Sequence, residues 1–132
     1  MKIVIIDGQG GRMGRSVIEQ LKKSYPDLEL YAIGTNSIAT SAMIKAGASH
    51  AATGENPAIV NSQDADIIIG PIGIVMANSL LGEITPAMAT AIGSSKAYKI
   101  LIPVNRCNHY IVGCQNNTLS DYINMVCEEV GK

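Results

Sequence analysis

The sequence predicts an α/β domain of three layers, in which helices cover both faces of a mostly parallel β-sheet. Two observations support this prediction. Short, unbroken runs of aliphatic residues recur along the chain, and several of them end at a glycine. Such runs are typical of strands that are buried on both faces of a parallel sheet. Helical patterns lie between the runs, and strands that alternate with helices form right-handed βαβ units.

The first half of the chain contains three predicted strands and two predicted helices. The strands are expected at residues 2–6, 28–33 and 48–53. The helices are expected at residues 13–24 and 38–46. Ser37 is a suitable N-cap for the second helix, and Gly47 fits the position just past its end. Residues 57–62 are ambiguous and could form a helical turn.

The second half contains three further predicted strands, at residues 66–69, 99–104 and 110–114. The last two are close enough in sequence to form an antiparallel hairpin. Helices are expected at residues 72–81, 86–95 and 119–130. Thr85 followed by Pro86 starts the second of these helices, and Thr118 with Asp121 forms a capping box at the third. We therefore expect one Rossmann-like domain over residues 1–132, with an antiparallel edge strand.

The composition excludes several classes of protein. Apolar residues make up 47% of the 132 residues and charged residues 16%, whereas disordered chains are rich in charge and poor in apolar residues. The net charge of -1 argues against the basic face that nucleic acid or an anionic membrane requires. Three cysteines, an odd number, do not resemble a secreted disulfide framework. We expect a cytoplasmic protein with no nucleic-acid partner and no membrane partner.

The low charge also predicts self-association. A domain of this size has a large surface for its volume, and 16% of charged residues leave part of that surface apolar. Exposed apolar patches often form contacts between subunits. We expect a homo-oligomer, most simply a two-fold dimer. The alternative is a monomer with an ordinary surface.

The strongest functional signal is a glycine-rich loop between the first predicted strand and the first predicted helix. It comprises Asp7, Gly8, Gln9, Gly10, Gly11, Arg12, Met13 and Gly14. Glycines allow a tight turn and let backbone N–H groups approach a phosphate, and the helix N-terminus adds a partial positive charge. We therefore expect bare N–H groups at residues 10–14 that contact a phosphate-bearing ligand. The alternative is a tight turn that holds no ligand.

The spacing of the glycines departs from the G-x-G-x-x-G pattern of dinucleotide sites, because Met13 stands where the third glycine is expected. The residues instead fit G-x-x-G-x-x-G at Gly8, Gly11 and Gly14, with Gly10 in addition. Residues 11–14 resemble the nucleotide loop of dihydrodipicolinate reductase, a family that reduces a cyclic imine with NADH or NADPH. That family's catalytic domain has no counterpart here. The resemblance implies a nucleotide loop and does not imply the activity.

Nearly the whole chain also resembles a bacterial family of short Rossmann-like proteins that is described as a domain of unknown function. The matching stretches lie at residues 6–11, 34–40, 70–74 and 82–86. This resemblance implies the fold and implies no activity.

The second predicted strand argues against NAD as the ligand. An NAD site has an acid near the end of this strand, where it binds the ribose hydroxyls. Asp27 and Glu29 lie at the start instead, and the end carries Thr35, Asn36 and Ser37. These residues and the next helix N-terminus could accept a second phosphate, which favours NADP(H) or a smaller phosphorylated ligand. Alternatively, Ser37 only caps its helix.

Further binding candidates follow the fourth and fifth predicted strands. Ligands bind outside the carboxyl ends of parallel strands, so residues there should line one cleft. They are Gly70, Pro71, Asn105 and Arg106. Arg106 could pair with a carboxylate or phosphate, or it could be a solvated arginine.

Catalytic and metal-binding candidates are weaker. Glu55 and Glu83 could act as a general acid or base if they are buried beside the ligand, although an acid in a turn or at a helix start is the simpler interpretation. Cys107 and His109 lack a third group to orient the base. The cysteine spacing does not match a structural zinc site. We assign no catalytic residue and no metal ligand from the sequence.

Three functions stay open. The first is a binding module, a sensor or accessory subunit that binds a nucleotide or another phosphorylated small molecule. The second is a minimal NADP(H)-dependent reductase, with its substrate held between subunits near Asn105, Arg106 and Glu83. The third is an interaction protein with a vacant loop. A well-placed glycine loop without a substrate domain favours the first.

Overall fold

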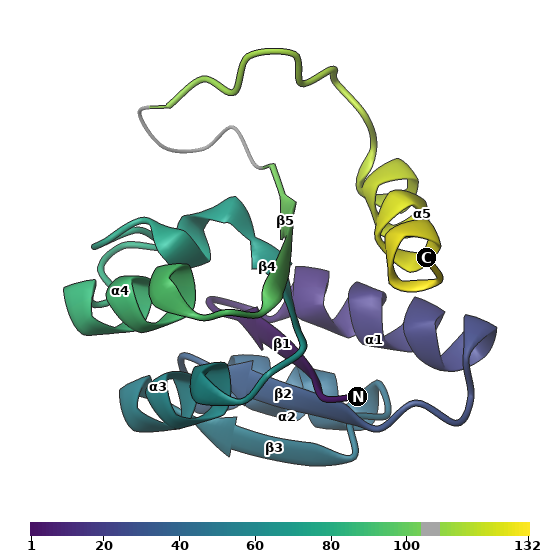
Figure 1. The fold of residues 1–132 in the computed structure, drawn as a ribbon, viewed down its shortest axis with the longest axis horizontal. Helices are drawn as coiled ribbons and strands as arrows, with labels where there is room; N and C mark the ends of the chain where they lie inside the picture. Colours follow the sequence, from purple (N-terminus) through teal and green to yellow (C-terminus); the bar gives the residue numbers. More distant parts are fainter. Residues whose placement is uncertain (104–108) are drawn as a thin grey trace.

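The computed structural model describes residues 1–103 and 109–132. In this part of the chain, five strands form a parallel sheet in the order β3-β2-β1-β4-β5 (Figure 1). The strands are β1 (Ile3–Asp7), β2 (Leu30–Gly34), β3 (His50–Thr53), β4 (Ile67–Pro71) and β5 (Tyr98–Ile102). The helices are α1 (Arg12–Ser24), α2 (Ser37–Lys45), α3 (Glu55–Gln63), the 3-10 turn η1 (Ile72–Val75), α4 (Pro86–Ser94) and α5 (Leu119–Val130).

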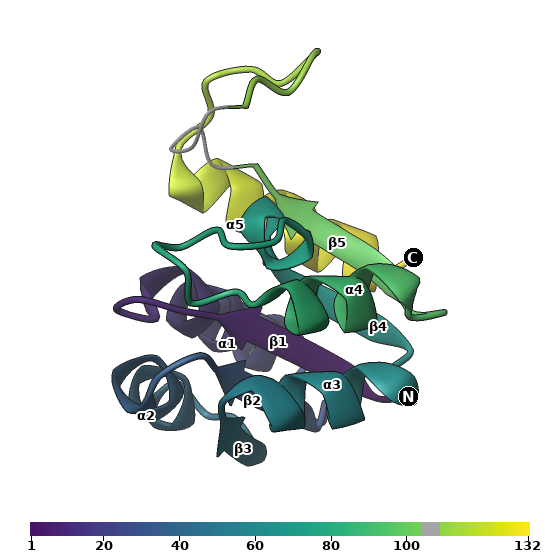
Figure 2. The same ribbon diagram turned by 90° about the vertical axis from the view of Figure 1, so that its left-hand side faces the viewer.

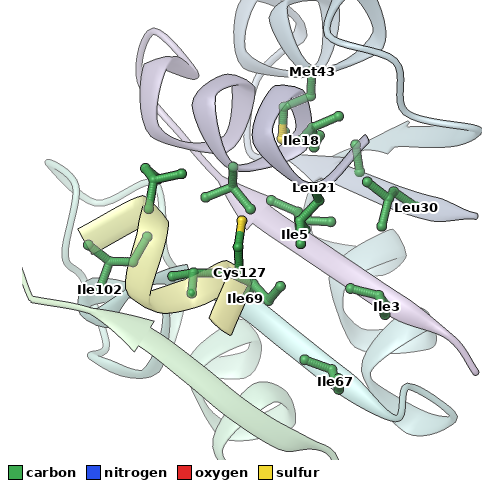
Figure 3. Packing of buried hydrophobic residues seen from close by; sticks show 14 residues of the cluster. Ile3, Ile5, Ile18, Leu21, Leu30, Met43, Ile67, Ile69, Ile102 and Cys127 are labelled. Carbon is green, nitrogen blue, oxygen red and sulfur yellow. The ribbon is translucent and has the colours of Figure 1, made fainter. Parts of the chain in front are cut away.

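Helices cover both faces of the sheet and form the three layers that the sequence predicts (Figure 2). The α1, α2 and α5 helices pack on one face, and α3 and α4 pack on the other. This division follows from the alternation of side chains along each strand. Ile3 and Ile5 of β1 point into the first core, whereas Val4 and Ile6 point into the second. Figure 3 shows the first core, where side chains of these three helices meet the strands.

The strand order reverses between β1 and β4. The chain runs outward from β1 to β2 and β3, and then crosses back to β4 and β5 on the other side of β1. In doubly wound α/β folds, ligands bind at this point, outside the carboxyl ends of the strands. The glycine loop follows β1 and Pro71 ends β4, so both lie at this position.

Most of the helix boundaries agree with the sequence. Thr118 and Asp121 form the predicted capping box of α5, with N–H···O distances of 3.1 Å in both directions. Thr85 accepts the N–H of Met88 and starts α4 as predicted. The ambiguous residues 57–62 lie within α3. Among the described helices, none has the length and apolar character needed to cross a membrane.

The N-cap of α2 is Asn36, and the prediction of Ser37 is wrong. The side-chain oxygen of Asn36 accepts the N–H of Ala39 at 2.9 Å. Ser37 is the first residue of the helix and is exposed. Asparagine and serine are equally favoured as N-caps, so the sequence does not distinguish two such neighbours.

Residues 72–81 do not form the predicted helix. The short turn η1 is followed by a loop in which Asn78, Leu80 and Leu81 have φ angles of 66°, 56° and 56°. The hydroxyl of Ser79 donates to the carbonyl oxygen of Gly73. A side chain that bonds a nearby backbone group in this way competes with the helix ladder. Leu80 packs against the second core, whereas Leu81 is exposed.

The antiparallel edge strand expected at residues 110–114 is also wrong. All strand pairs of the described sheet are parallel, and β5 pairs with β4. Residues 109–118 project away from the sheet as irregular chain (Figures 1 and 2). The N–H of Cys114 donates to the carbonyl oxygen of Ile111 at 3.2 Å, which closes a turn. An alternating apolar pattern predicts a strand, but it does not specify which neighbour the strand has.

We expect Gly70→Ala to lower the free energy of unfolding by about 1–3 kcal/mol, the usual cost of overpacking. A Cβ at Gly70 would meet the backbone carbonyl oxygen of Ile6, which cannot move unless β1 shifts. Gly93→Ala in α4 is the control, because nothing lies within 4 Å of that Cβ. It should raise the stability by about 0.5–1 kcal/mol through helix propensity. Urea unfolding measures both, and an unchanged midpoint for Gly70→Ala would contradict the close approach of β1 and β4.

Candidate functional site

A cavity of about 590 Å³ lies at the carboxyl ends of β1 and β4. Its volume is within the range of small-molecule sites, roughly 300–1,000 Å³. The glycine loop forms one wall through residues 7–13, and the apolar loop after η1 forms another through Met76, Ser79, Leu80 and Leu81. Pro71, Gly73, His109 and Leu119 complete the lining. The structure thus brings most of the predicted loop residues and Pro71 to one cavity.

The carboxylate of Asp7 bonds backbone N–H groups at both ends of the glycine loop. One carboxylate oxygen accepts the N–H of Gly8 at 2.8 Å, and the other accepts the N–H of Gly14 at 2.7 Å. The carboxylate therefore joins the end of β1 to the first turn of α1, whose N-terminus favours a negative charge. The Asp7 residue is 5% exposed. Burial raises the pKa of Asp7 above its ordinary value, against the opposing effect of the N–H groups that it accepts.

The carboxylate of Glu83 bonds the middle of the same loop. Its Oε1 accepts the N–H of Gln9 at 2.7 Å, and its Oε2 accepts Nδ2 of Asn36 at 2.8 Å. The Nδ2 group of Asn36 also donates to the carbonyl oxygen of Gln9 at 3.0 Å. Glu83 thus connects the loop before α4 to the glycine loop and to the N-cap of α2. The sequence singled out Glu83 as an acid near the ligand, but it gave no signal for a contact between residues so far apart in the chain.

The N–H groups of the glycine loop are therefore less bare than the sequence predicts. Besides the bonds to Asp7 and Glu83, the N–H of Gly11 donates to the carbonyl oxygen of Gly8 at 2.9 Å. The N–H of Met13 also bonds the carboxylate of Asp7. Within the described residues, the loop N–H groups without a partner are therefore those of Gly10 and Arg12. An incoming anion would meet these two groups first.

Packing explains the G-x-x-G-x-x-G spacing. Gly11 has φ of 72°, and its Cβ would meet the Cα of Ala39 at 2.7 Å. At Gly14 a Cβ would meet Sδ of Met43 at 2.6 Å. Both glycines thus let α1 approach α2. Gly10 is different, since its nearest neighbour would be Cγ of Arg12 at 3.9 Å, and the open space there faces the cavity.

Arg12 supplies positive charge at the cavity. Its side chain is exposed and lines the cavity. In the described part of the chain it forms no ion pair, unlike Arg15, which pairs with Glu19 at 2.8 Å. A guanidinium at the first position of a helix, above unpaired N–H groups, is a combination suited to phosphate.

The other predicted binding residues lie elsewhere or outside the described residues. Thr35, Asn36 and Ser37 are at the end of β2 and do not line the cavity. The Oγ1 atom of Thr35 is buried without a hydrogen-bond partner in the described structure. Gly70 is buried against β1. Asn105 and Arg106, and with them Cys107, lie outside the described residues.

The raised pKa of Asp7 makes a testable contribution to stability. Between 3.8, its ordinary pKa, and the raised value in the folded state, the folded protein holds a proton that the unfolded chain has released. The stability of the wild type relative to Asp7→Asn should therefore rise as the pH falls from neutrality through this window. Urea unfolding of both proteins at several pH values measures the difference. A difference that stays constant would show that the N–H bonds offset burial, and one that falls with decreasing pH would show that they outweigh it; either result would contradict a raised pKa.

Comparison with known proteins gives a family and no activity. The family model described as "Domain of unknown function (DUF3842)" matches residues 2–132. Neither a curated protein nor a solved structure matches the chain. The match covers nearly the whole chain, including the three layers of the fold and both walls of the cavity. The chain therefore belongs to the DUF3842 family.

Proposed function

We propose that this domain binds a phosphorylated small molecule of mononucleotide size in the cavity beside the glycine loop, and that it acts as a sensor or accessory module. One observation carries the proposal. The unpaired N–H groups of Gly10 and Arg12 and the guanidinium of Arg12 lie together at the wall of a 590 Å³ cavity. The N-terminus of the 13-residue helix α1 is at the same place, and it favours an anion.

The negative charge of Asp7 does not oppose this assignment strongly. Asp7 lies under the loop with 5% of its surface exposed, and its two oxygens already accept N–H groups. Its raised pKa also lowers the cost of protonating it. The charge that faces the cavity most openly is therefore that of Arg12.

The opposite wall suits the organic part of such a ligand. Met76, Leu80 and Leu81 line it, and Leu81 is 98% exposed. Exposure of this apolar side chain to water is unfavourable, and a ligand that covers it would gain free energy from its burial. A base or another flat ring placed against this wall would bury that surface while the phosphate contacts Gly10 and Arg12.

The size limit follows from Glu83. In a dinucleotide site the ligand continues from the glycine loop toward the end of β2. Here Glu83 and Asn36 occupy that direction and bond each other and Gln9. NADP(H), one of the ligands expected from the sequence, would have to displace Glu83, whereas a mononucleotide or a sugar phosphate would not.

Binding is tested by thermal unfolding with AMP, FMN, ribose 5-phosphate, NADPH and inorganic phosphate as probes. A ligand at 100 times its Kd should stabilise the fold by about 2.7 kcal/mol. Gly10→Asp should abolish this stabilisation, because it places a carboxylate at the two unpaired N–H groups. Gly10→Ala should retain it, because the site has room for a Cβ and φ is not positive. Equal responses of both variants would remove the glycine loop from the binding site.

Arg12→Gln should weaken binding of the stabilising probe at least about tenfold, a loss of about 1.4 kcal/mol. Arg15→Gln is the matched control, because Arg15 lies on the same helix but pairs with Glu19. Isothermal titration measures both affinities. An equal loss in the two variants would indicate a general effect of charge instead of a phosphate contact at Arg12.

Glu83→Ala tests the size limit. Removal of the carboxylate frees the N–H of Gln9 and the side chain of Asn36, so the affinity for NADPH should rise at least about tenfold while that for AMP changes little. Titration of both ligands against both proteins measures the difference. If NADPH already binds the wild type as tightly as it binds the variant, Glu83 does not limit the ligand.

A second function, an interaction protein with a sealed loop, is favoured by the internal bonds of the loop. The N–H groups of Gly8, Gln9, Gly11 and Gly14 all have acceptors within the chain. A failure of every probe to stabilise the fold would favour this function over ligand binding.

A further inference from the structure

The β5 strand ends the sheet, and in the described part of the chain its outer edge has no neighbour. The N–H of Tyr98 donates inward to the carbonyl oxygen of Asp66 at 2.9 Å. Because hydrogen-bonding groups alternate between the two sides of a strand, Lys99 and Leu101 direct their N–H and C=O groups to the open side. An open edge of this kind is a template for another strand.

A groove of about 560 Å³ runs along this edge. The β5 residues form one side of the groove, and Tyr122, Met125 and Val126 of α5 form another. Residues 113–115 and 117, which follow in the same chain, also line it. Ile100 and Leu101 are only half-buried, whereas every residue of β4, the next strand inward, is buried. The edge therefore lacks the apolar cover that one more strand would supply.

The chain itself carries a segment with the properties of that strand. We call residues 109–118 the arm. Tyr110 and Val112 of the arm are 80% and 87% exposed. Val112 lies in the turn that Ile111 and Cys114 close, so both side chains would share one side of a strand only after this turn opens. In Figures 1 and 2 the arm stands away from the sheet and the helices. These two side chains are thus presented to a partner and not to the core of their own chain.

The second half of the arm lies across the groove from its own β5, beside α5. The hydroxyl of Tyr122 donates to the carbonyl oxygen of Gln115 at 2.7 Å, which fixes the second half of the arm to α5. The turn closed by Ile111 and Cys114 lies just before it. The first half of the arm therefore points outward from a fixed base.

We propose that residues 110–112 of the arm pair with the open edge of β5 in a second copy of this chain, and that the exchange is reciprocal in a two-fold dimer. A two-fold axis lets each protomer give one arm and receive one, so that both edges are covered. The net charge of -1 opposes such self-association very little. His109, the first residue of the arm, and Leu119, the residue that follows it, also line the cavity beside the glycine loop, so the exchange would restrain this part of the cavity lining.

Sedimentation velocity over a dilution series tests the assembly. The wild type should be a dimer that dissociates on dilution, and Val112→Lys should raise its dissociation constant at least about tenfold. Val60→Lys is the matched control, because Val60 is an exposed valine of α3 on the opposite face of the sheet. Circular dichroism should match the wild type in both variants, since neither valine belongs to the core. The urea midpoint of Val112→Lys should match that of the wild type only at concentrations where the wild type is dissociated, because association stabilises the folded state.

Amide hydrogen exchange tests which edge is covered. The amides of Lys99 and Leu101 should exchange slowly in the dimer and quickly in Val112→Lys at the same concentration. The amides of Ile100 and Ile102, which face β4, should be slow in both and serve as the internal reference. Three outcomes would overturn the proposal: a wild type that is monomeric at every concentration, a dimer that Val112→Lys leaves intact, or slow exchange of Lys99 and Leu101 that persists in the monomer. The last would mean that the arm folds back on its own chain.

Discussion

The arrangement at the centre of this protein depends on the Asp7 carboxylate. It ends the first buried strand, and it accepts one N–H from Gly8, at the start of the turn, and one from Gly14, inside the helix that follows. Strand, turn and helix are thereby fixed relative to one another by a single side chain. The same bonds use up N–H groups that a phosphate would otherwise take, so the group that builds the loop also restricts where on it a ligand can bind. In the described structure, the N–H groups of Gly10 and Arg12 have no acceptor, and they stay available to a ligand.

The glycine spacing illustrates how one pattern can satisfy two requirements. Gly11 and Gly14 are required by the approach of α1 to α2, since a side chain at either position would collide with Ala39 or Met43. In this protein, two glycines of the loop are explained by close helix packing alone, so their presence does not by itself indicate a ligand. Gly10 has no such packing requirement, and for this reason it is the more informative position about binding.

Much of the fold could be predicted from the sequence because the information is local. Unbroken aliphatic runs predict strands buried on two faces, and Thr118 with Asp121 marks a helix start within four residues. Two of the failures arise from local competition, because Asn36 caps α2 in place of Ser37 and the hydroxyl of Ser79 bonds Gly73 where a helix was expected. The other failures depend on partners distant in the chain. Residues 110–114 have no neighbouring strand in the part of the chain that the structure describes. The contact of Glu83 with Gln9 joins residues 74 positions apart, and no local pattern encodes it.

The left-handed backbone between Asn78 and Gly82 has a consequence for this contact. Asn78, Leu80 and Leu81 hold conformations that are unfavourable for residues with a Cβ, and Glu83 at the end of the segment is anchored to Gln9 and Asn36. Backbone hydrogen bonds within residues 78–84, among them Asn78 N–H to the carbonyl oxygen of Ile84 at 2.7 Å, hold these conformations in place. The position of the Glu83 carboxylate is therefore set by a rigid turn of its own loop, so the turn orients Glu83 for its contacts with Gln9 and Asn36.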